Sequence, residues 1–130
     1  MTNSGSLAVG AISEYYVASV LTSYGYDVSV VRAKGYDLIA IDPEDGRIIR
    51  VEVKGARTLI NRNYKQPRVN FCTRSVVEGT CDVLAFHLIP TNDLVFLDPE
   101  PYFKTFSLTK KPADIFGDDP RGTWENAIKQ

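Results

Sequence analysis

The chain has 130 residues, of which 44% are hydrophobic and 24% are charged, and its formal net charge at pH 7 is −1. This size and composition predict one compact globular domain and leave no room for a second large one. No apolar run approaches the roughly 18 residues of a membrane span, and the start MTNSGSLAVG lacks a signal-peptide pattern, so we expect a cytoplasmic protein without membrane contact.

A long helix is expected over residues 6–24, which contain no proline and end at Gly25, a favourable residue after a helix. Helical spacing places Glu14 within an apolar stripe that should face the core. The opposite side of the helix is apolar as well, which suggests that a partner chain or a second layer covers it. The residues on that opposite side are Val9, Ile12, Tyr16 and Val20.

Three strands should follow, over residues 26–32, 37–41 and 47–54, with the turn DPEDG between the last two. In the third strand every second residue is apolar, and the residues between them are Arg50, Glu52 and Lys54. Because side chains alternate between the faces of a strand, one face of this hairpin should serve the core and the other should present charged groups.

Further strands are expected over residues 69–73, 82–89 and 94–98, with a helical turn or loop between the first two. Cys72 and Cys81 have no metal-ligand spacing, so we expect both to be reduced core residues, and His87 to be a hydrogen-bonded core histidine without a catalytic role. PEPYF should begin a short helix. We therefore predict a domain over residues 1–103 and an extension over 104–130, with a terminal helix over TWENAIKQ, which packs on the domain or on a partner subunit.

Positive charge is concentrated in one part of the chain. Residues 55–75 contain five basic and no acidic side chains, whereas acidic side chains outnumber basic ones on both sides of this block. Such a block is a candidate phosphate-binding surface, and a solvated basic loop is the competing interpretation. The basic residues are Arg57, Arg62, Lys65, Arg68 and Arg74.

Asp37 and Glu52 can lie side by side across the antiparallel hairpin, with Lys54 two residues further along the same face. Two carboxylates suit a hard cation such as Mg2+, and a lysine beside them can orient a water molecule or stabilise a developing negative charge. This set of residues fits phosphodiester hydrolysis. The competing interpretation is a cluster of surface salt bridges.

From Gly10 to Arg57 the chain resembles the PD-(D/E)XK nuclease superfamily: Asp37 is followed by Glu52-Val53-Lys54 on a hydrophobic strand, and Glu14 stands in the preceding helix. Tyr36 replaces the usual proline. The resemblance implies an α/β fold with a restriction-endonuclease-like core, in which helices flank a central mixed sheet of four to five strands. It also implies a Mg2+-dependent endodeoxyribonuclease, with Mn2+ as a possible substitute.

In this interpretation Asp37, Glu52 and the backbone carbonyl of Val53 bind the metal, while Lys54 is catalytic and Glu14 supports the site. DNA is the expected partner, together with a second or further copies of the chain as a homodimer or homotetramer, because cutting both strands of a duplex calls for two active centres. The expected DNA contacts are Arg57, Arg62, Tyr64, Lys65, Gln66, Arg68 and Arg74.

Two branches of the superfamily remain open. The first half is similar to small Holliday-junction resolvases, although Tyr15 stands where these often carry arginine. The second half, with NRNYKQPRVNFCTRS in place of a helix, is more similar to compact endonucleases of bacteria, phages and group I introns, including a tetrameric homing type. A non-catalytic DNA-binding or assembly module on the same fold is the alternative function.

Overall fold

The computed structural model describes residues 2–61 and 64–129, with the side chains of the first helix described from residue 8 onward. The elements follow one another in this order: α1 (Thr2–Ser23), β1 (Asp27–Ala33), β2 (Tyr36–Ile41), β3 (Ile48–Ala56), β4 (Val69–Cys72), β5 (Val83–Leu88), η1 (Ile89–Thr91), β6 (Asp93–Leu97), η2 (Glu100–Tyr102), β7 (Ser107–Lys110), α2 (Pro112–Ile115) and α3 (Pro120–Ile128). The strands and helices predicted up to residue 98 are present with shifted ends.

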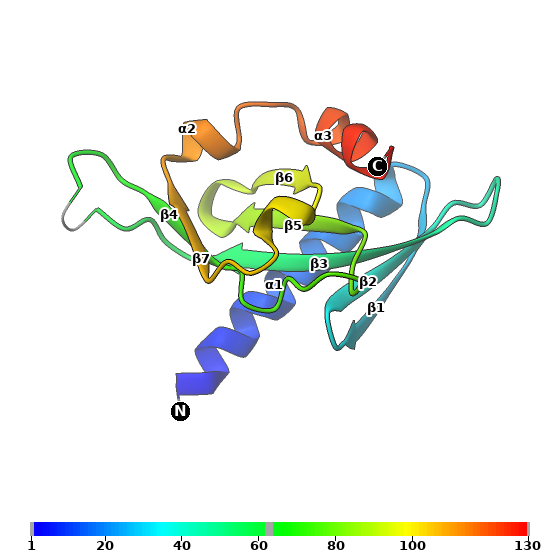
Figure 1. Ribbon diagram of the computed structural model, residues 1–130, viewed down its shortest axis with the longest axis horizontal. Coiled ribbons are helices and arrows are strands. Elements are labelled where there is room, and N and C mark those ends of the chain that lie inside the picture. Colours follow the sequence, from blue (N-terminus) through cyan, green and yellow to red (C-terminus); the bar gives the residue numbers. More distant parts are fainter. Residues whose placement is uncertain (1, 62–63, 130) are drawn as a thin grey trace.

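A five-stranded sheet in the order β1-β2-β3-β5-β6 forms the centre of the molecule (Figure 1). The pair β3–β5 is parallel and the other neighbours are antiparallel, so the sheet is mixed. This confirms the predicted fold class, an α/β fold with a mixed sheet of four to five strands flanked by helices. Because β5 runs parallel to β3, the chain must return between them, and residues 57–82 make this crossover.

The central sheet is covered on both faces at its middle strands, whereas the residues of the edge strand β1 are exposed or half-buried. One face packs against α1 and α3, in a cluster that includes Val17, Leu21, Leu38, Val51, Val53 and Trp124. The other face packs against β4 and the segment after it, in a cluster that includes Phe71, Val76, Leu84 and Phe86. Since Leu38, Val51 and Val53 point to the first face, strand alternation sends Asp37, Glu52 and Lys54 to the second.

The helix α1 begins at Thr2, earlier than predicted, and ends at Ser23 before Gly25, whose φ of 101° is the left-handed conformation expected after a helix. Its second apolar side is partly covered by the protein itself, because the ring of Tyr16 stacks on His87 at 4.5 Å. Ile12 and Tyr15 remain 47% and 58% exposed. Over residues 2–61 and 64–129, no helix is long and apolar enough to cross a membrane.

His87 is the core histidine that the sequence predicts: it is fully buried, its Nδ1 lies 2.8 Å from Ser13 Oγ, and its Nε2 lies 2.9 Å from Asn92 Oδ1. The prediction for the cysteines is correct for Cys81, which is buried, and wrong for Cys72, which is exposed. In β4, alternate residues point inward, and Cys72 falls on the outer side of the strand.

The segment after residue 103 contains one strand that the sequence analysis did not predict. This strand, β7, pairs antiparallel with β4, so the segment is joined to the earlier part of the chain by a second, two-stranded sheet. The helix α3 begins after Asp119, whose carboxylate accepts a hydrogen bond from the backbone N–H of Gly122, and packs its fully buried Trp124 against the central sheet. Both contacts hold residues 104–129 against the body of the protein (Figure 1).

Candidate active site

Asp37 and Glu52 are brought together by the register of the β2–β3 hairpin. Leu38 pairs with Val51, and one further step in this antiparallel register places Asp37 opposite Glu52. Asp37 is held in place because its Oδ2 accepts a hydrogen bond of 2.8 Å from the backbone N–H of Val53. The two carboxylates that the sequence predicts as metal ligands are therefore neighbours at one end of the hairpin.

The two carboxylates are crowded in a partly desolvated position. Burial raises the pKa of Asp37 from 3.8 to about 7, with a further contribution from the neighbouring Glu52. Glu52 is only 5% exposed. Lys54 gives partial compensation, since its Nζ lies 3.6 Å from Glu52 Oε2 and its charge lowers the pKa of Asp37 slightly. This end of the sheet thus carries more negative charge than its surroundings neutralise.

Ser75 is a member of this group that the sequence analysis missed. Its hydroxyl donates a hydrogen bond of 2.8 Å to Glu52 Oε2 and accepts one from Lys54 Nζ, so it links the carboxylate to the ammonium. Ser75 lies in the loop after β4, on the crossover between β3 and β5. No spacing in the sequence signals this contact, because it forms only when the crossover folds back over the sheet.

Glu14 is buried on α1 and is bound by a residue that the sequence analysis did not single out. Glu14 Oε1 lies 2.7 Å from Nε of Arg32, whose guanidinium also stacks over the ring of Tyr15 at 5.5 Å. Arg32 has a φ of 49°, and the register of β1 and β2 shifts at this point, so a local irregularity of β1 directs the arginine toward α1. The supporting role of Glu14 at the metal site stays a prediction.

The approach of α1 to β3 depends on Gly55, the residue after Lys54. A Cβ at this position would overlap the side chain of Ser13, so only glycine lets the helix lie this close to the strand. Ser13 precedes Glu14 in the helix, and Gly55 follows Lys54 in the strand. The contact therefore brings the helical glutamate to the end of β3 that carries Lys54. Over the described ranges 2–61 and 64–129, no three or more His, Cys, Asp or Glu side chains form a group that could hold a metal ion.

Five of the seven predicted DNA contacts lie on an arm, described over residues 57–61 and 64–68, that extends from the body of the protein between β3 and β4 (Figure 1). A backbone bridge between Ile60 and Arg68 closes the arm at its base. Arg57, Lys65 and Gln66 are exposed on it. Arg62 lies outside the described residues.

Two further basic side chains are paired with aromatic rings. The guanidinium of Arg68 lies 5.2 Å from the ring centre of Tyr64, which is 41% exposed. Arg74, beside Ser75, lies 5.5 Å from the ring centre of Phe106, which is 71% exposed. Exposed aromatic rings next to cations are suited to nucleic acid, since bases stack on the rings while phosphates pair with the charge.

Comparison with known proteins identifies a fold. No family model matches the chain, and no curated protein matches it by sequence. Among solved structures, the bacterial homing endonuclease I-Ssp6803I is similar, with a TM-score of 0.67 and 16% sequence identity over 93% of this chain and 89% of that chain. At this level of identity the similarity establishes that the two chains share a fold.

Proposed function

We propose that this chain is a metal-dependent DNA endonuclease that hydrolyses phosphodiester bonds, of the PD-(D/E)XK type. The proposal rests on one observation above all: Asp37, Glu52 and Lys54 converge at one end of the β2–β3 hairpin, in a partly desolvated position. The fold shared with a homing endonuclease supports a nuclease-type function.

The residues at this position fit a hard divalent cation. The pKa of Asp37 is raised by burial and by Glu52, which is the condition that a bound cation would relieve. Asp37 and Glu52 would be ligands of Mg2+ or Mn2+, and the backbone carbonyl of Val53 would add a third, with water and phosphate oxygens completing the shell. When bound, the cation supplies positive charge to the scissile phosphate and activates a water molecule.

Lys54 and Ser75 would act on the phosphate and the attacking water. The ammonium of Lys54 is held by Ser75 and Glu52, so it is already oriented to donate a hydrogen bond to a phosphate oxygen. Ser75 would position the ammonium of Lys54 and the carboxylate of Glu52. Glu14, close to the end of the same strand, would support the site once released from Arg32.

The arm would hold the DNA backbone. Its cations lie outside the carboxylate group, and no acidic residue separates them along residues 55–75. Since each chain carries one such site, we expect two or more copies to act on the two strands of a duplex. The exposed Ile12 and Tyr15 on α1 are the residues we would expect at a contact between copies.

A non-catalytic DNA-binding module is the second candidate, and one observation favours it. Glu14 already has a charged partner in Arg32, at 2.7 Å, so this carboxylate is neutralised without a metal. In a binding module, Asp37 and Glu52 would have no catalytic use. The nuclease should cleave bound DNA when Mg2+ is added, whereas the binding module should leave it intact.

The deciding experiment is cleavage of supercoiled plasmid, a four-way junction and single-stranded DNA in Mg2+, Mn2+ or EDTA. We expect nicking of duplex DNA with either metal and none with EDTA. Lys54→Ala should reduce cleavage on the order of 100-fold while DNA affinity in a gel-shift titration changes little. Lys129→Ala, which removes an exposed lysine at the end of α3, is the matched control. Binding of DNA without any metal-dependent cleavage would establish the second candidate instead.

A further inference from the structure

A pocket of about 800 Å3 lies next to the candidate active site, on the same face of the sheet as Glu52 and Lys54. Its lining comes from two segments of the chain, one between residues 74 and 78 and the other between residues 100 and 106. Ser75, whose hydroxyl contacts Glu52 and Lys54, lies in the chain between the lining residues Arg74 and Val76. The second segment is fastened next to the first, because Thr73 N–H donates to the carbonyl of Phe106 at 3.0 Å and the hydroxyls of Thr73 and Thr105 are 2.5 Å apart. The pocket is therefore lined by the same loop that carries Ser75.

The pocket has exposed apolar walls. Val77 is 52% and Phe106 is 71% exposed, and Phe103 lines the same space. Large apolar side chains grouped at the surface commonly mark a binding site. The volume lies within the roughly 300–1,000 Å3 of sites that hold small ligands.

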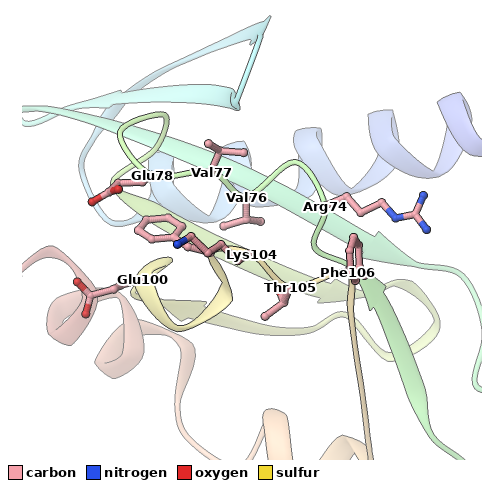
Figure 2. Close-up of a pocket in the computed structure, with 9 residues that line it drawn as sticks. Arg74, Val76, Val77, Glu78, Glu100, Lys104, Thr105 and Phe106 are labelled. Carbon is pink, nitrogen blue, oxygen red and sulfur yellow. The ribbon is translucent and has the colours of Figure 1, made fainter.

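The pocket is lined by charged residues of both signs. Figure 2 shows Glu78 and Glu100 toward one end, Arg74 beside Phe106 at the other, and Lys104 between them. The guanidinium of Arg74 lies over the Phe106 ring, at 5.5 Å from its centre. Arg74 directly precedes Ser75 in the chain, so the same loop carries a cation of the pocket and a residue of the candidate active site.

From this arrangement we infer that the pocket binds one nucleotide of the nucleic acid with its base out of the helical stack. The phosphate pairs with Arg74, the base lies against Phe106 and Val77, and Glu78 and Glu100 accept hydrogen bonds from an exocyclic amino group of the base. The inference deepens the proposed function and rests on it. It also assigns a preference, since cytosine and adenine carry such an amino group and thymine does not.

The test is a titration of the isotope-labelled protein with deoxycytidine, deoxyadenosine and thymidine 5′-monophosphates, followed by amide NMR shifts. Deoxyribose 5-phosphate, which has no base, is the ligand control. We expect the first two nucleotides to shift residues 76–77 and 104–106 and to bind more tightly than thymidine monophosphate, and the sugar phosphate to leave the apolar wall unchanged. Equal binding of all three nucleotides would overturn the role of Glu78 and Glu100.

Phe106→Ala should weaken binding of deoxycytidine monophosphate at least about fivefold, and Phe106→Trp should retain it because the stacking surface is kept. Ile48→Ala removes an apolar side chain of similar exposure, 60%, at the start of β3, and should bind as the wild type does. Wild-type affinity in Phe106→Ala, or equal shifts with deoxyribose 5-phosphate, would overturn the inference. Plasmid nicking measured on the same samples separates the two proposals. Nicking without nucleotide binding would refute the nucleotide-binding pocket alone. Nucleotide binding without nicking would refute the nuclease function alone.

Discussion

The crowding of Asp37 and Glu52 makes a prediction about stability that needs no activity assay. Because the pKa of Asp37 is raised from 3.8 to about 7, the folded protein keeps a proton on this carboxyl over a pH range in which the unfolded chain has lost it. The contribution of Asp37 to stability should therefore fall as pH rises from about 4 to about 7, and the full penalty should remain above that range. Asp37→Asn has no charge to bury and should escape the penalty.

The size of the effect follows from the displacement of the pKa. A rise of the pKa from 3.8 to about 7 limits the loss in the free energy of unfolding at alkaline pH to about 4 kcal/mol. Asp37 is only partly buried, so water screens the charge, and we expect about 1–2 kcal/mol. For a chain of this length that corresponds to a melting temperature higher in Asp37→Asn by roughly 3–8 °C at pH 8. At pH 4 the two proteins should melt together.

The assay is thermal unfolding in EDTA from pH 4 to pH 8, repeated at pH 8 with Mg2+. Magnesium should raise the melting temperature of the wild type and leave Asp37→Asn nearly unchanged, because the variant has lost a ligand. Asp27→Asn, at an exposed position that starts β1, is the matched control and should follow the wild type throughout. A constant difference between Asp37→Asn and the wild type at every pH would refute the reasoning, since it would show that Asp37 is not buried as a charge.

Three further predictions concern other parts of the molecule. Ser75→Ala should lower the cleavage rate on the order of 10-fold with little change in DNA affinity, and Ser75→Thr should restore it; a loss of affinity instead would make Ser75 a DNA contact. Lys65→Ala with Arg68→Ala should reduce the salt dependence of DNA binding by about one unit of slope for each lost phosphate contact, and an unchanged slope would make the arm a solvated loop. Burial lowers the pKa of His87 below 6.5, so His87 should contribute a loss of stability below about pH 6.5, opposite in sign to the contribution of Asp37, and melting of His87→Gln should lack this loss; a fall of the same size in His87→Gln would assign it to other groups.

The central sheet and its charged face were predictable because they depend on local patterns. The alternation of side chains along β3 determines which residues share a strand face with Glu52, and the turn between β2 and β3 determines the hairpin register. The carboxylate pair follows directly from these two features. The similarity in fold to I-Ssp6803I agrees with this prediction of the architecture.

The parts that were not predicted depend on contacts between distant residues. β7 is a four-residue strand that, among the residues the structure describes, pairs with β4 alone, and nothing in Ser107–Lys110 itself distinguishes it from a loop. Ser75 meets Lys54 across 21 positions, and Arg32 meets Glu14 across 18. In both cases the contact is created by how a loop or an irregular strand folds back, which composition and spacing do not encode.

The remaining choice is between a catalytic group and a cluster of structural salt bridges, and a second acidic residue near the sheet helps to decide it. Asp82 is bound by Arg50 through two side-chain contacts of 3.1 Å, and although burial alone would raise its pKa, the hydrogen bonds and charge of Arg50 lower it. That is the behaviour of a carboxylate in a structural ion pair. Asp37 lies on β2, and its pKa is raised, chiefly by burial and further by the neighbouring carboxylate of Glu52, while the charge of Lys54 lowers it by less. A fold that needed only stability would have given Asp37 a partner like Arg50. The uncompensated pair instead matches a position that a divalent cation would complete, which is why the metal-dependent stabilisation of the wild type is the decisive measurement.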